Sequence, residues 1–124
     1  MKFAKITFWV AAIWGFIVIV PLYFIFGTIG RMDPPPITHP TFYYGFVGTA
    51  LAWQLAFLIV ARDPQRFRPL IPACVLEKGA FVTAVIVMVM QGRTRPSDLV
   101  FAVTDGTLGV LFIVSYLKLR PYTN

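Results

Sequence analysis

Glu77 and Lys78 are adjacent charged residues inside a long apolar run, and they are the residues best placed to do chemistry. A helix beginning only at Gly79 would have about a dozen residues before Gln91, roughly 20 Å at 1.5 Å per residue, which is too short to cross a bilayer. The helix must therefore begin near Pro69–Pro72, which places Glu77 roughly 10 Å below the membrane boundary. A charge at that depth costs at least about 2–3 kcal/mol, so Glu77 needs a partner or a proton.

We expect Glu77 and Lys78 not to pair along the helix, because adjacent side chains leave it about 100° apart. Helical side chains lean toward the N-terminus, so we expect the Lys78 amine to reach back to the membrane surface. Glu77 is shorter, and Gln54 on the preceding apolar run lies at a similar depth, with Trp14 near the same level. Trp14, Gln54 and Glu77 are therefore predicted to form either a structural interhelical hydrogen bond or a ligand or proton site.

Asp105 is the second acid inside an apolar run, roughly 10 Å from the opposite membrane face. An acid at that depth normally faces the bundle interior or a wet cavity, so Asp105 joins the candidate ligand or proton site. Glu77 and Asp105 approach from opposite sides, with roughly 10 Å of depth between them. They form either part of a proton path or two separate contacts between helices. Nothing in the sequence brings them close enough for paired-carboxylate hydrolysis.

Other catalytic centres lack the residues they need. The chain has one cysteine, Cys74, and one histidine, His39, which excludes a Cys-x-x-Cys redox centre and a bis-histidine haem within the chain. No phosphate-binding glycine loop or nucleophile elbow is present. We therefore expect no metal, no cofactor and no catalytic activity of the chain's own.

Four apolar runs must position these residues. The chain has 124 residues, of which 58% are hydrophobic and 13% charged, whereas soluble domains average about 45–50% and about 25%. The runs cover approximately residues 6–27, 42–61, 70–90 and 99–117. Each is close to the roughly 20 residues that a spanning helix needs, and the connections are short. We predict an all-α, integral-membrane, up-down four-helix bundle formed by a single domain, residues 1–124.

Small residues along one side of the second run suggest a packing face. They are Gly45, Gly48 or Thr49, Ala52 and Ala56. This face packs against another helix of the same chain or against a second copy in a homodimer.

The basic residues indicate an orientation. The net charge is +6, but the basic residues lie between apolar runs and form no basic arm, so we expect no nucleic-acid partner. Seven of the eleven lie at the ends of the chain or in the second loop: Lys2, Lys5, Arg62, Arg66, Arg68, Lys118 and Arg120. The first and third loops carry only Arg31, Arg93 and Arg95. The positive-inside rule then places both termini in the cytoplasm, with the bilayer most simply a bacterial inner membrane.

Four segments carry a resemblance to a known group. They are Phe46–Gln54 (FVGTALAWQ), Arg62–Pro69 (RDPQRFRP), Leu76–Lys78 (LEK) and Thr104–Phe112 (TDGTLGVLF). Over roughly residues 42–118 the chain resembles the small bacterial four-helix membrane proteins grouped as DoxX-like. The resemblance implies a four-helix membrane fold and a role as a partner subunit in quinone-linked redox complexes or in envelope stress. It assigns no catalytic residue to this chain.

We expect a small accessory subunit of another membrane protein or a binder of a hydrophobic molecule, such as a quinone or another lipid-like ligand. Gln54, Glu77 and Asp105 would form its polar core. One alternative is a homodimeric proton-coupled carrier of a small solute, in which Glu77 or Asp105 takes up the proton. The other is a membrane subunit of a quinone-linked oxidoreductase, in which Trp14, Gln54 and Glu77 line a head-group pocket.

Overall fold

The computed structural model describes residues 1–120, and these residues form helices and connections without a strand. The α-helices are α1 (Lys2–Ile19), α2 (Phe26–Met32), α3 (Pro40–Arg62), α4 (Ile71–Met90) and α5 (Leu99–Lys118). Short 3₁₀ turns extend α1 (η1, Val20–Tyr23) and precede α4 (η2, Arg68–Leu70) and α5 (η3, Pro96–Asp98). Four helical segments are long and apolar enough to cross a membrane: Lys2–Tyr23, Pro40–Arg62, Arg68–Met90 and Pro96–Lys118. The predicted all-α membrane bundle is confirmed, and the chain is a multi-pass membrane protein.

Prolines mark where the long helices begin and end. Pro40 is the first residue of α3, and prolines also occupy the first turns of η2, α4 and η3. Proline is well suited to these positions because the first N–H groups of a helix have no intrahelical acceptor. Pro21 ends the regular α-helix of α1, which continues as the 3₁₀ turn η1. After α4 the chain reverses at Gly92, whose φ of +68° is a conformation that favours glycine.

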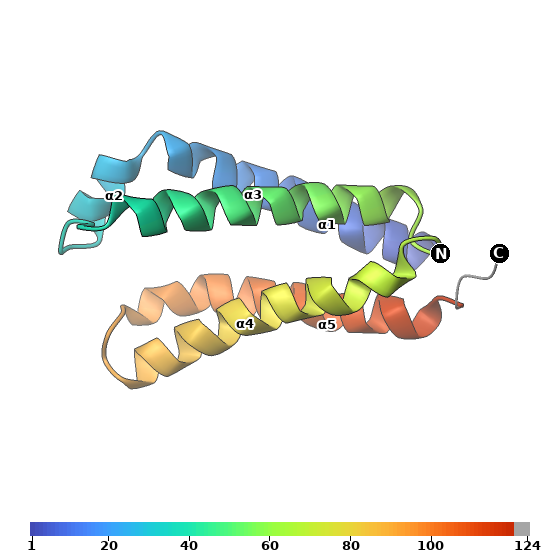
Figure 1. The fold of residues 1–124 in the computed structure, drawn as a ribbon. Helices are drawn as coiled ribbons and strands as arrows, with labels where there is room; N and C mark the ends of the chain where they lie inside the picture. The colour runs from blue at the N-terminus through green and yellow to red at the C-terminus, as the bar shows by residue number, and fades with distance from the viewer. Residues whose placement is uncertain (121–124) are drawn as a thin grey trace.

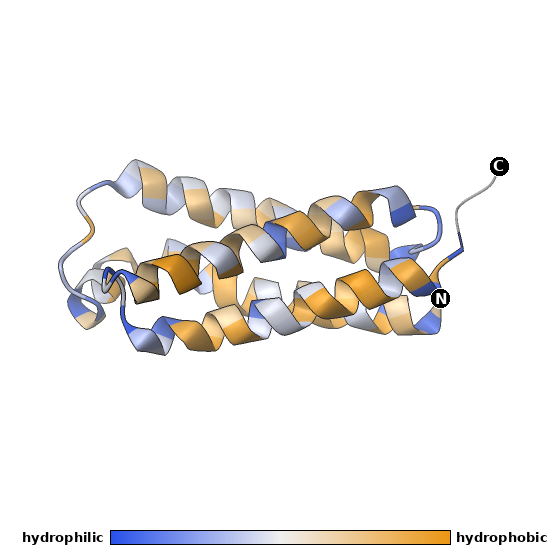
Figure 2. Ribbon diagram, turned by 90° about the horizontal axis from the view of Figure 1, so that it is seen from below, coloured by the Kyte–Doolittle hydropathy of each residue, from blue (hydrophilic) through white to orange (hydrophobic). Residues whose placement is uncertain are grey.

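The bundle consists of two helical hairpins (Figure 1). α1 packs along α3, α4 packs along α5, and the main contact between the hairpins is that of α1 with α5. α3 and α4 follow each other in the chain but barely touch. The short helix α2, which the sequence analysis did not predict, caps the first hairpin at the end opposite the chain termini. Figure 2 shows apolar residues along the long helices and hydrophilic residues gathered mainly in the connections.

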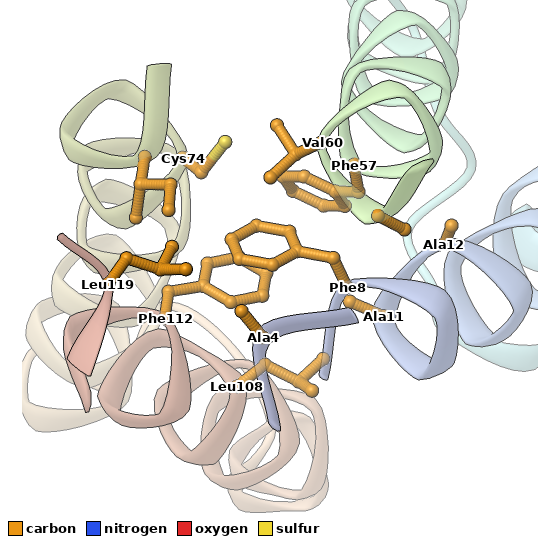
Figure 3. Packing of buried hydrophobic residues seen from close by; sticks show 12 residues of the cluster. Ala4, Phe8, Ala11, Ala12, Phe57, Val60, Cys74, Leu108, Phe112 and Leu119 are labelled. Atoms are coloured by element: carbon orange, nitrogen blue, oxygen red, sulfur yellow. The ribbon is translucent and has the colours of Figure 1, made fainter. Parts of the chain in front are cut away.

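The core lies near the chain termini and joins both hairpins (Figure 3). Its centre is three fully buried rings, one each from α1, α3 and α5: Phe8, Phe57 and Phe112. Phe8 stacks on Phe112 with centroids 4.3 Å apart, and Phe57 meets Phe112 edge-on at 5.1 Å. Toward the other end, a smaller cluster of Ile19, Val47 and Ala50 involves only α1 and α3. The two hairpins are therefore held together mainly at the end that carries the termini.

A polar contact links the hairpins at the other end. Arg95, in the α4–α5 connection, places Nε 3.0 Å from Asp33 Oδ1 and donates a hydrogen bond to the Met32 carbonyl at 3.3 Å. Both charged side chains are well exposed, so this contact contributes little, about 0–1 kcal/mol. Between the two ends, large apolar side chains cover the outside of the bundle, as lipid contact requires.

Candidate functional site

Lys78 lies in the α4–α5 interface, and only 4% of it is exposed. Its Nζ donates a hydrogen bond to Asp105 Oδ1 on α5 at 3.4 Å and lies 3.7 Å from Glu77 Oε2 on its own helix. Two expectations were therefore wrong: the amine does not reach back to the membrane surface, and Lys78 does pair with Glu77. The lysine side chain is long enough to reach Glu77 although the two residues leave the helix about 100° apart. Asp105 on the facing helix holds the ammonium within the α4–α5 interface.

Gly109 on α5 lets the lysine enter this interface. A Cβ atom added at Gly109 would lie 3.3 Å from Lys78 Cβ, which is tighter than ordinary van der Waals contact. One added at Gly106 would lie 3.8 Å from Val82 Cγ2. Small residues allow membrane helices to approach closely, and here the approach brings Lys78 within reach of Asp105.

Phe57 on α3 brings a third helix into contact with the site. Lys78 Nζ is 5.1 Å from the centroid of this ring, within the roughly 6 Å over which a cation is attracted to an aromatic face. The ammonium thus faces two carboxylates and one aromatic ring, contributed by α3, α4 and α5. We call Glu77, Lys78 and Asp105 the charged cluster.

The charged cluster contains two acids and one base. The Glu77 and Asp105 side chains are each 19% exposed, and Glu77 Oε2 has no hydrogen-bond partner among residues 1–120. One ammonium balances only one carboxylate, so the fully ionised cluster carries one negative charge in excess. Such an excess within a membrane span is costly, and a bound proton or small cation removes it.

Gln54 and Trp14 lie apart from the charged cluster. Gln54 is 2% exposed, and its Nε2 donates to the Ala50 carbonyl of its own helix at 2.8 Å. It faces Gly15 of α1, where an added Cβ would lie 1.7 Å from Gln54 Oε1. Trp14, next to Gly15, is 39% exposed on the outer face of α1. The structure therefore brings Glu77 and Asp105 together through Lys78, while Gln54 packs on α1 and Trp14 faces outward.

The role of Lys78 as a bridge and the contribution of Phe57 were missed from the sequence. The buried residues of α4, which are Ile71, Cys74, Lys78 and Val85, follow one face of a helix. The sequence did not single out this face, because apolar residues lie on every side of α4.

Two open cavities lie at the ends of the bundle. One, of about 380 Å³, is lined by Asp33, Pro34, Pro35, Gly92, Arg93, Thr94 and Arg95. The other, of about 210 Å³, is lined by Met1, Gln65, Lys118, Leu119 and Arg120. Within residues 1–120, no three His, Cys, Asp or Glu side chains gather as metal ligands do. The side chains of the charged cluster line neither of these two cavities.

No protein-family model, curated protein or solved structure matches this chain. The resemblance to DoxX-like proteins therefore stays a prediction.

Proposed function

We propose that this chain is an inner-membrane protein of bacterial type that takes up and releases a proton at the charged cluster, and that it acts as a homodimeric proton-coupled carrier of a small solute. The observation that carries the proposal is the convergence of two carboxylates, from Glu77 and Asp105, on the single buried ammonium of Lys78. Intramembrane acids in such surroundings are typical of proton relays in transporters.

The geometry of the cluster favours exchange over a fixed ion pair. Lys78 Nζ lies at similar distances from the two acids, 3.4 Å from Asp105 and 3.7 Å from Glu77. The ammonium can therefore pair with either carboxylate, and the acid that it leaves is the one that takes up a proton. A change in pairing moves the proton site between α4 and α5 without moving the helices far.

The distribution of basic residues supports an orientation in the membrane, and exposed small residues support a homodimer. Seven basic residues at the end with the termini support a cytoplasmic location for that end. On α3 three residues of the predicted small-residue face, Gly45, Thr49 and Ala52, are exposed, whereas Gly48 lies against the Tyr23 hydroxyl of η1 and Ala56 is half-buried. A second copy packed on the exposed part of this face would form a dimer with eight spanning helices, which is the assembly that the carrier proposal requires.

Infrared difference spectroscopy of the protein in lipid nanodiscs tests the proton site. We expect a carboxylic-acid band that changes with pH in the wild type and is lost or shifted in both Glu77→Gln and Asp105→Asn. Asp63→Asn is the matched control, because Asp63 is an acid just beyond the end of α3, and it should leave the band unchanged. A spectrum that is identical in the wild type and both cluster variants would contradict the proposal.

An accessory subunit is the second candidate, favoured by the exposed small residues of α4: Gly79, Ala80, Thr83 and Ala84. These residues allow a helix of another protein to approach closely. Native mass spectrometry after gentle extraction from the membrane separates the two candidates, since a homodimer favours the carrier and a stoichiometric foreign subunit favours the accessory role. The quinone-linked alternative gains no support, because Trp14 faces away from Gln54 and Glu77.

A further inference from the structure

The cavity of about 210 Å³ at the end with the termini is basic. Lys118 and Arg120 line it together with Gln65, which adds a side-chain amide. None of the residues that line it, all within the described part of the chain, is acidic. Two cationic groups and a hydrogen-bond donor around one small cavity are the groups that bind a phosphate.

The neighbourhood reinforces this positive charge. Lys2, Lys5 and Arg66 are exposed at the same end of the bundle. The single acid of this end is Asp63, and its carboxylate already accepts a hydrogen bond from the Arg66 backbone N–H at 3.3 Å. Lys118 is also held toward α1, because its Nζ lies 4.6 Å from the Phe3 ring centroid. Basic residues therefore outnumber the one acidic side chain at this end, which favours the approach of an anion.

An apolar track on α5 runs along the membrane span and ends at Leu117, the residue before Lys118. Val110, Ile113 and Leu117 are 59%, 44% and 73% exposed. Their spacing of three and four residues places them on one face of the helix, and the adjacent Lys118 leaves the helix about 100° around from Leu117. A molecule with a negative head and a hydrocarbon chain matches the cavity and the track together, whereas free phosphate matches the cavity alone.

We propose that the cavity between Gln65, Lys118 and Arg120 binds the phosphate headgroup of an anionic phospholipid, whose acyl chain lies along Val110, Ile113 and Leu117. Basic pockets beside membrane helices are known sites for such headgroups. This inference is independent of the charged cluster, which lies deeper in the span, and of the proposed carrier function.

Native mass spectrometry of the detergent-purified protein tests the site by titration with phosphatidylglycerol and with phosphatidylcholine of the same acyl chains. We expect tighter binding of phosphatidylglycerol. The double variant Lys118→Gln/Arg120→Gln should weaken it about 25-fold, at about fivefold for each charge removed. The charge-conserving variant Lys118→Arg/Arg120→Lys should retain the binding.

The matched control is Arg31→Gln/Arg93→Gln, which removes two charges at the opposite end and should change the affinity less than twofold. Glycerol 3-phosphate, the soluble headgroup without chains, should compete only weakly, because it cannot use the apolar track. Equal affinity for the two lipids, equal losses in the two double variants, or tight competition by glycerol 3-phosphate would each overturn the proposal.

Discussion

Replacing Lys78 by Met is expected to lower the free energy of unfolding by about 3–5 kcal/mol. Methionine fills a similar volume, so the change removes mainly the ammonium and leaves Glu77 and Asp105 without the cation that separates their charges. The loss is large because an uncompensated charge in a low-dielectric interior costs far more than an exposed ion pair contributes. SDS-induced unfolding of the protein in detergent micelles, followed by circular dichroism, measures the change.

Two further variants show whether charge is the cause. The triple variant Lys78→Met/Glu77→Gln/Asp105→Asn is neutral throughout and should recover most of the lost stability. Lys5→Met removes an exposed lysine from α1 and should change the stability by less than about 0.5 kcal/mol. If Lys78→Met behaves like Lys5→Met, the ammonium lies at the membrane surface, as the N-terminal lean of helical side chains had suggested.

The fold was predictable because bilayer thickness sets a strong constraint on sequence. A run of about 20 apolar residues is long enough to span, and every backbone polar group in the span must be satisfied within a helix. Prolines such as Pro40 and Pro96 then mark where helices begin. The short helix α2 was not predictable in this way, because its seven residues include Gly27 and Gly30 and lie in a proline-rich connection.

The site was predictable in its acids but not in their partners. Depth along a helix follows from counting residues, which identified Glu77 and Asp105 as intramembrane acids. Which helices pack together does not follow from depth. The sequence analysis paired the third run with the second through Gln54, whereas α4 packs on α5 and only touches α3. The close approach at Gly109, which brings α5 against Lys78, could not be read from the sequence alone.

Gln54 and Trp14 illustrate the same limit on a smaller scale. Gln54 is buried, as a polar residue in a candidate interior site should be, but it faces Gly15 of α1. Adjacent helical residues point about 100° apart, so the contact that turns Gly15 inward leaves Trp14 exposed. A hydropathy pattern that is apolar on every side of the helix gives no indication of which of the two faces inward.

Replacing Phe112 by Ala is expected to lower the free energy of unfolding by about 3 kcal/mol. Phe112 is fully buried, stacks on Phe8 of α1 and meets Phe57 of α3 edge-on, so it joins the two hairpins where they are most closely packed. The value lies at the low end of the range for Phe-to-Ala changes in soluble cores, because lipid tails provide no hydrophobic force between helices and only packing is lost. The SDS-unfolding measurement described above applies here too.

Phe101→Ala is the matched control, since Phe101 lies on the same helix but is 47% exposed toward lipid. It should cost less than about 1 kcal/mol, because lipid tails fill the space that the ring leaves. Because the smaller cluster of Ile19, Val47 and Ala50 does not reach α4 or α5, the loss of Phe112 should also loosen the hairpins from each other before either hairpin unfolds. Cysteine cross-linking between α1 and α5 should then fall while cross-linking between α1 and α3 persists, and an equal fall in both pairs would contradict a core that joins two separately packed hairpins.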